Sequence, residues 1–203
     1  MKKIMFYGLL VLSICGPNSV WAEAPHKLAG FVLGGYLHNF KDQIESDTVI
    51  PVRYLESLKE VEAKEIKGFK TGLVTYATCI GPAIIVSLKF KYADNSKRFF
   101  DELLQRYRAK VGKPDEWRGD PFHIVIAWKW RFTDKDNNRI SLILQHNTRD
   151  EEEKQGTVVK MTMWNLMLEE DRCFAKKHPE TAVLPTFKFE DPDSVNWGHL
   201  IPR

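Results

Sequence analysis

The segment from Pro121 to Phe132, PFHIVIAWKWRF, alternates large apolar side chains with small or charged ones. Alternate residues of a β-strand point to opposite faces, so a strand here separates the aromatic side chains from the cations. Burial of six large apolar side chains contributes on the order of 10 kcal/mol of gross stabilisation. The segment therefore predicts a wall of the hydrophobic core. The apolar face holds Phe122, Ile124, Ile126, Trp128, Trp130 and Phe132, and the other face holds His123, Val125, Ala127, Lys129 and Arg131.

The following segment, NNRISLILQHNT, alternates in the same way and predicts the partner strand of a hairpin. A three-residue loop at 136–138 places Phe132, Trp130 and Trp128 opposite Leu142, Leu144 and His146, so the apolar faces coincide. A two-residue loop at 137–138 would place Trp130 opposite Gln145 and spoil this match. The pattern therefore favours the three-residue loop.

The rest of the chain predicts an α+β fold, a mostly antiparallel sheet with helices packed on one face. A helix is expected after Asn95 or Ser96 as its N-cap and should end at Gly112, before Pro114. Residues 60–66 favour a strand, although helix propensity leaves that alternative open. Further strands are expected within 68–79, 83–92 and 157–166, and a short helix within 168–179.

The N-terminus has the charged, apolar and small-residue order of a secretory signal peptide. Two lysines precede an apolar run from Ile4 to Ile14, which is about half the length of a membrane span. Cleavage is expected after Ala22. A lipoprotein anchored at Cys15 is the weaker alternative, because Ile14 occupies the position that favours a small residue. The chain is thus divided into a signal peptide (1–22), one α+β domain (23–180) and an extended, proline-containing tail (181–203).

Charge and cysteine content narrow the class of protein. The chain has 30 basic and 27 acidic side chains, and loss of Lys2 and Lys3 with the leader leaves 28 against 27, a net charge of +1. This balance does not favour a nucleic-acid partner. Two cysteines remain, Cys79 and Cys173, and in an oxidising envelope they predict one disulfide. A reactive or metal-binding thiol is the weaker alternative, because there is no CxxC pair and only Arg172 and Lys176 lie near Cys173.

Two stretches resemble known proteins. The segment LLQRYRAKVGKPDEW resembles the helix-Gly-Pro-Trp entry of small α+β lipoprotein modules of outer-membrane assembly. The segments GFKTGLVTYATC, KVGKPDEWRGDPFHIVIAWKWRF and ISLILQHNTRDEEEK are similar to a family of bacterial secreted proteins. That resemblance spans most of the mature chain and implies no particular activity.

No catalytic or cofactor motif stands out. The residues Asp134, Asp136 and Asn138 begin like a calcium loop, but Arg139 replaces the turn glycine and Gln145 the bidentate glutamate. The histidines show no metal-ligand spacing, and no GxSxG elbow or phosphate loop is present. We expect neither a metal nor another cofactor.

Three functions remain open: a non-catalytic envelope protein that binds a protein partner or a small polar or anionic ligand, a periplasmic hydrolase, and a structural or stress-related accessory protein. The first has the most support, because strong core patterning comes without a catalytic motif. The hydrolase alternative would use Asp120, His123 or His146. The candidate binding residues are His123, Lys129, Arg131, Gln145 and Asn147 on the strands and Trp117, Arg118 and Asp120 in the preceding loop.

Overall fold

The computed structural model describes residues 24–53, 55–147 and 156–179. The predicted signal peptide and lipidation site, the acidic run 150–153 and the predicted tail lie outside these residues. Among the residues described, no helix has the length and apolar character needed to cross a bilayer.

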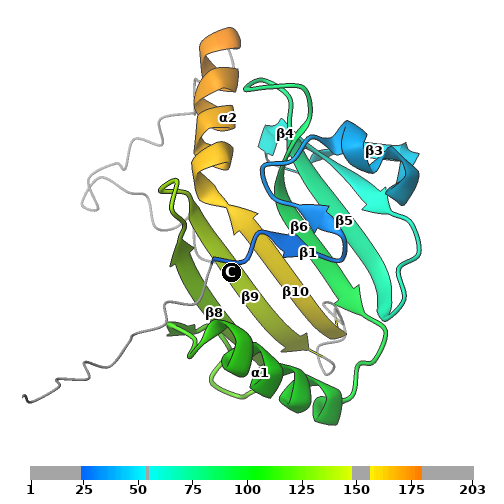
Figure 1. The fold of residues 1–203 in the computed structure, drawn as a ribbon, viewed down its shortest axis with the longest axis vertical. Helices are drawn as coiled ribbons and strands as arrows, with labels where there is room; N and C mark the ends of the chain where they lie inside the picture. Colours follow the sequence, from blue (N-terminus) through cyan, green and yellow to red (C-terminus); the bar gives the residue numbers. More distant parts are fainter. Residues whose placement is uncertain (1–23, 54, 148–155, 180–203) are drawn as a thin grey trace, which may run out of the picture.

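The α+β class is confirmed, and its main feature is one eight-stranded antiparallel sheet (Figure 1). The strand order is β3-β4-β5-β6-β10-β9-β8-β7, and a small sheet pairs β1 with β2. The elements are β1 (Lys27–Leu28), β2 (Phe31–Val32), the 3-10 helix η1 (Leu37–Gln43), β3 (Ile44–Val52), β4 (Leu55–Ala63), β5 (Phe69–Ala77), β6 (Ile84–Tyr92), α1 (Lys97–Val111), β7 (Glu116–Trp117), β8 (Val125–Thr133), β9 (Arg139–Asn147), β10 (Gly156–Met163) and α2 (Trp164–Lys177).

The two faces of the large sheet differ in chemistry. Residues paired directly across antiparallel strands share a face, so the strand register identifies each row of side chains. One row is apolar, and we call its side the aromatic face: Val61, Val74, Leu88, Met161, Leu142 and Trp130. The next row defines what we call the cationic face, because its lysines lie on the central strands, with glutamates at both ends: Glu45, Glu62, Leu73, Lys89, Lys160, Ile143, Lys129 and Glu116.

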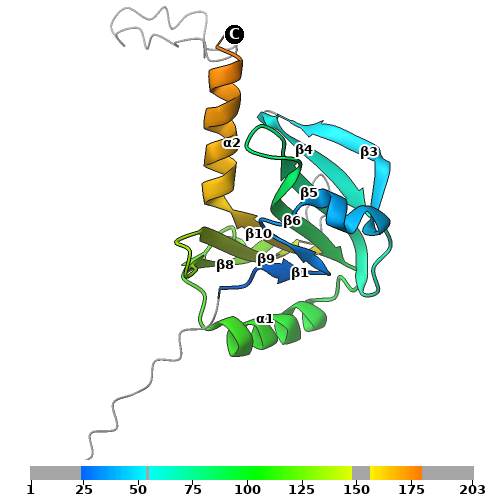
Figure 2. The same cartoon turned by 45° about the horizontal axis from the view of Figure 1, so that its top comes forward.

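The aromatic face is the core of the molecule. The helix α1 places Phe100 and Leu104 against it, and the N-terminal segment adds Phe31 and Leu33. Figure 2 shows α1 on one side of the strands, with β1 near it and α2 rising on the other side. The expected helix caps are present: the Ser96 hydroxyl accepts the Phe99 N–H, and the Gly112 N–H donates to the Arg108 carbonyl.

The helix α2 packs against the other face of the sheet instead of joining α1. Its residues Leu166 and Met167 contact a small cluster formed by Leu58, Ala77 and Val86. Val86 reaches this side because the pairing of β5 with β6 shifts between Thr75 and Tyr76, as at a β-bulge. The helix begins at Trp164, four residues before the predicted segment.

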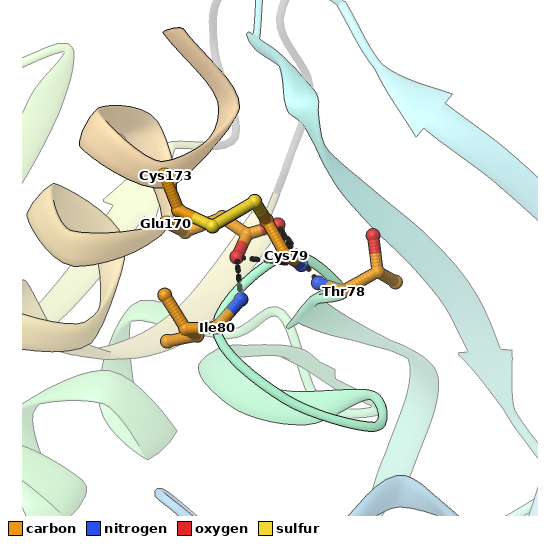
Figure 3. The surroundings of a disulfide bond; sticks show 5 residues. All are labelled: Thr78, Cys79, Ile80, Glu170 and Cys173. Atoms are coloured by element: carbon orange, nitrogen blue, oxygen red, sulfur yellow. Dashed lines mark hydrogen bonds between the residues drawn. A yellow bond between two sulfur atoms is a disulfide. The ribbon is translucent and has the colours of Figure 1, made fainter. Parts of the chain in front are cut away.

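The predicted disulfide is present and fixes α2 to the end of β5 (Figure 3). The Cα atoms of Cys79 and Cys173 are 5.8 Å apart. One turn earlier in α2, the fully buried carboxylate of Glu170 accepts hydrogen bonds of 2.8–2.9 Å from the backbone N–H groups of residues 78, 79 and 80. A covalent bond and a charge-assisted hydrogen-bond cluster therefore anchor the same turn.

The predicted hairpin register is wrong by two residues. Trp130 lies opposite Leu142 instead of Leu144, and the loop contains the five residues 134–138. The reason is Asp134, whose carboxylate accepts the N–H groups of Asp136 and Asn138 and ends the strand early. A shift of two residues preserves the strand parity, so the predicted separation of aromatic and cationic faces is retained within β8.

The strand β8 begins at Val125, later than predicted. The Asp120 carboxylate accepts the N–H groups of Phe122 and Val125, and His123 has a positive φ of 56°. This turn leaves Phe122 81% exposed, so the expected place of Phe122 on the core face is wrong. At the other end of the sheet, residues 60–63 form the end of strand β4, so the strand and not the helix is the correct alternative there. Strand β3 was not predicted.

Candidate anion-binding site

Two of the predicted binding residues, Lys129 and Arg131, lie side by side on the cationic face of β8. Strand alternation explains their place, since Trp128, Trp130 and Phe132 take the opposite face and pack with the core. Lys129 is half-buried and Arg131 is exposed. Both side chains are therefore held on a rigid strand while they reach solvent.

A pocket of about 280 Å³ lies beside these two cations, where β8 and β9 meet the start of α2. No acidic side chain lines it among the residues that the structure describes. Its polar lining combines three cations with hydroxyl groups and an indole ring. The lining residues are Lys129, Arg131, Phe132, Thr133, Arg139, Ile140, Ser141 and Trp164.

The hydroxyl of Ser141 is oriented by its neighbour. The indole Nε1 of Trp164 donates to Ser141 Oγ at 2.9 Å, so the hydroxyl proton of Ser141 remains able to donate to another acceptor. The residue next to it in α2, Asn165, accepts the backbone N–H of Arg139 at 2.7 Å. These two bonds fix the start of α2 against β9 and give the pocket a constant wall.

The electrostatics of the pocket favour an anion. Partial burial lowers the pKa of the Lys129 amine, and the positive charges of Arg118 and Arg131 lower it further, while Glu116 opposes them. Glu116 itself accepts from Arg118 at 2.9 Å and pairs with Arg131. The Glu116 carboxylate thus pairs with both arginines. Among the described residues, the amine of Lys129 forms no ion pair.

Further along the same row, Lys160 is another lysine whose pKa is lowered by burial and by a neighbouring cation. Its neighbours on the cationic face are Lys89 on one side and Ile143 on the other. The surrounding side chains desolvate its amine and lower its pKa, Lys89 adds to the effect, and Glu60 opposes it. Positive charge therefore continues across β6 and β10 from the pocket.

The predicted residues of the loop before β8 form a different cluster. The ring of Trp117 packs edge-on against Trp128 at 4.8 Å and lies 5.5 Å from the ring of His123. Asp120 is occupied by the turn described above. Of the loop residues, Arg118 alone contributes to the cationic face, through Glu116.

The remaining predicted residues do not line the pocket. Gln145 lies on the cationic face opposite Ala127 and is partly exposed, whereas Asn147 is fully buried opposite Val125. The register predicted from the sequence would also pair Lys129 with Gln145 and Ala127 with Asn147. These two pairs are wrong for the same reason as the register, since Lys129 lies opposite Ile143.

The residues proposed for hydrolysis have separate partners. The Nδ1 atom of His146 hydrogen-bonds to the Thr157 hydroxyl at 3.0 Å, and its ring stacks on Phe100 inside the core. Between His123 and Asp120 the structure shows a backbone hydrogen bond. Within the described part of the chain, no group of three or more His, Cys, Asp or Glu side chains could hold a metal ion.

Comparison with known proteins adds no relative. No family model, curated protein or solved structure matches the chain.

Sequence reasoning missed Arg139, Ser141 and Trp164. In the sequence Arg139 stands out only as the residue that breaks a calcium loop, and Ser141 only as a possible partner of His146 in a catalytic triad that no GxSxG spacing supports. The alternation of β9 does place Ser141 on the side of Lys129, which is the one signal available. Trp164 comes from the far end of β10, and no local pattern links it to β8.

Proposed function

We propose that the mature protein is an exported, non-catalytic binding protein that takes a small anionic ligand in the pocket between β8, β9 and α2. The observation that carries the proposal is the lining itself, three cations with two hydroxyl groups and no acidic side chain among the described residues. The disulfide supports export to an oxidising compartment, in agreement with the order of residues in the leader.

The ligand class follows from the donors. Lys129 and the two arginines supply charged N–H groups, and Ser141 and Thr133 supply hydroxyls, so carboxylate or phosphate oxygens are matched by charge-assisted hydrogen bonds. An anion in the pocket would also oppose the burial and the arginine charges that lower the pKa of Lys129. Binding should therefore raise the pKa of this amine.

The experiment is a calorimetric titration with inorganic phosphate and with citrate at low ionic strength. The double variant Lys129→Gln/Arg131→Gln should weaken binding by about tenfold or more, because charged hydrogen bonds contribute roughly 1.5–3 kcal/mol each. Its unfolding midpoint should change little, since both side chains reach solvent.

The matched control is Lys41→Gln/Arg98→Gln, which removes the same charges from exposed positions in η1 and α1. This control should bind both anions like the wild type. Equal weakening in the two double variants would show that only net charge matters, and absence of binding of either anion to the wild type would refute the proposal.

A further inference from the structure

A second crevice lies on the opposite side of the sheet, between β1 and the C-terminal half of α1. Its volume is about 220 Å³. Its floor consists of Leu142 and Met161, which belong to the aromatic face and are each only 2% exposed. The crevice therefore borders the core at this point. The lining residues are Pro25, Lys27, Leu28, Arg106, Tyr107, Lys110, Val111, Leu142 and Met161.

The walls of this crevice are held in place. The hydroxyl of Tyr107 hydrogen-bonds to that of Tyr92 at 2.9 Å, which fixes the ring in the α1 wall. On the other side, the carbonyl of His26 accepts the Leu33 N–H at 2.9 Å, and the imidazole of His26 pairs with Asp134 at 3.2 Å. The segment that carries Lys27 and Leu28 is therefore tied to its own hairpin and to the β8–β9 loop.

The rim of the crevice is cationic. Arg106 is paired with Glu102 at 2.6 Å, whereas the side-chain amines of Lys27 and Lys110 have no hydrogen-bond or ion-pair partner among the residues described. Both lysines are exposed, one on each wall. No acidic side chain of the described chain lines the crevice. An apolar floor under two unpaired cations is the arrangement that matches an anion with a hydrocarbon tail.

We propose that this crevice binds a single anionic amphiphile, a short acyl chain whose charged head lies between Lys27 and Lys110. A cavity of about 220 Å³ accommodates roughly seven groups of the size of a water molecule, at about 30 Å³ each. This is the length of chain in octanoate, whose carboxylate would then emerge at the rim. The tail would contact Leu28, Leu142 and Met161.

This inference is independent of the site on the cationic face. The two cavities share no lining residue and lie on opposite sides of the sheet. The variant Lys129→Gln/Arg131→Gln should therefore bind octanoate like the wild type, and failure of one proposal leaves the other intact.

The test uses the mature protein labelled at the methionine methyl groups and titrated with octanoate, followed by NMR. The Met161 signal, assigned with Met161→Leu, should shift in a saturable way, because its side chain forms the floor. The Met167 signal should stay unchanged, since Met167 packs against Leu58, Ala77 and Val86 on the other face.

Two variants distinguish the contribution of the charged head group to binding from that of the hydrocarbon tail. Lys27→Gln/Lys110→Gln should weaken octanoate binding by about three- to tenfold and leave 1-octanol binding unchanged, because exposed charge pairs contribute modestly. Leu28→Trp should fill the crevice and abolish the Met161 shift with either compound.

Three results would overturn the inference. They are no saturable Met161 shift with octanoate, equal octanoate affinity in the wild type and the double lysine variant, and unchanged binding in Leu28→Trp. Since both lysines are exposed, the double variant should keep its fold, and an unchanged methyl spectrum without ligand verifies this.

Discussion

The two faces of the sheet are made by the same strands, yet they hold their side chains in opposite ways. Trp130 on the aromatic face is 1% exposed, while its neighbour Lys129 is half-buried beside two arginines. The aromatic face gains stability from apolar burial, whereas the cationic face holds Lys129 close to Arg118 and Arg131, with Glu116 as the carboxylate that both arginines pair with. The main apolar core therefore lies on one face, whereas the other face carries α2 over one part and exposes charged side chains over another.

The strongest test of this contrast compares adjacent positions of β8. Trp130→Ala should lower the free energy of unfolding by about 3–5 kcal/mol, because it leaves a cavity in the core and removes the 2.8 Å bond from the indole Nε1 to the Gly112 carbonyl. Lys129→Ala should cost well under about 1 kcal/mol. Denaturant unfolding of both variants measures the difference.

Trp130→Phe provides the control for this pair. It retains an aromatic ring in the core and removes only the indole bond and part of the packing, so its loss should lie between the two alanine variants. Equal losses for Trp130→Ala and Lys129→Ala would mean that the two faces do not differ in their contribution to stability.

Beneath α2, a buried carboxylate stabilises the end of the cationic face: Glu170 accepts the backbone N–H groups of residues 78–80. Glu170→Gln keeps the side-chain shape but turns one acceptor into a donor facing backbone N–H groups, so we expect a loss of about 2–4 kcal/mol. Chemical denaturation with the disulfide intact measures it. The neighbouring exposed Glu169 supplies the control, and Glu169→Gln should be nearly neutral. A neutral Glu170→Gln would show that the disulfide alone anchors this turn.

Much of this contrast could be predicted from the sequence, because strand alternation and helix caps are local signals. The pattern of residues 125–133 identified both faces, and Ser96 and Gly112 marked the ends of α1 correctly. The two cysteines that follow the predicted leader predicted the disulfide. Each of these inferences needed only neighbouring residues or a count.

The rest depended on contacts between distant parts of the chain. Glu170 meets the turn at 78–80 about ninety positions away, and it looks like any other acid in a charged helix. The hairpin register failed because a single side chain, Asp134, sets the loop length. The pocket could not be foreseen since Trp164 reaches Ser141 only after β9 and β10 have paired.

A smaller effect is expected from His146, the one histidine that is buried in the described core. Burial lowers the pKa of its imidazole, Lys97 lowers it further, and Asp101 opposes this. The unfolded chain therefore takes up a proton near pH 6.5 while the folded protein does not, so stability falls as the pH drops below about 6.5.

This loss is limited to about 1.4 kcal/mol per pH unit for one proton. His146→Gln removes the titration, so the free energy of unfolding should depend less steeply on pH between about 6.5 and 5. Urea unfolding at a series of pH values gives both slopes. Identical slopes would mean that His146 takes up its proton equally in the folded and unfolded states, which would contradict the lowered pKa of the buried imidazole.

The smallest effect sharpens the description of the cationic face. The pKa of Lys160 is lowered in the folded protein, so the unfolded chain binds more protons between the folded pKa and about 10.5, and stability rises with pH across that window. At pH 7 the charged amine is therefore slightly destabilising, and Lys160→Met should stabilise the protein, by less than about 0.5 kcal/mol because the side chain reaches solvent.

The stabilisation by Lys160→Met should shrink toward pH 10.5 and in high salt, whereas Lys113→Met in an exposed loop should give none. Thermal unfolding at pH 7 and pH 10 measures both variants. A clear loss of stability in Lys160→Met would show that this amine is already satisfied by a partner, and the cationic face would then belong to the scaffold as much as the aromatic face does.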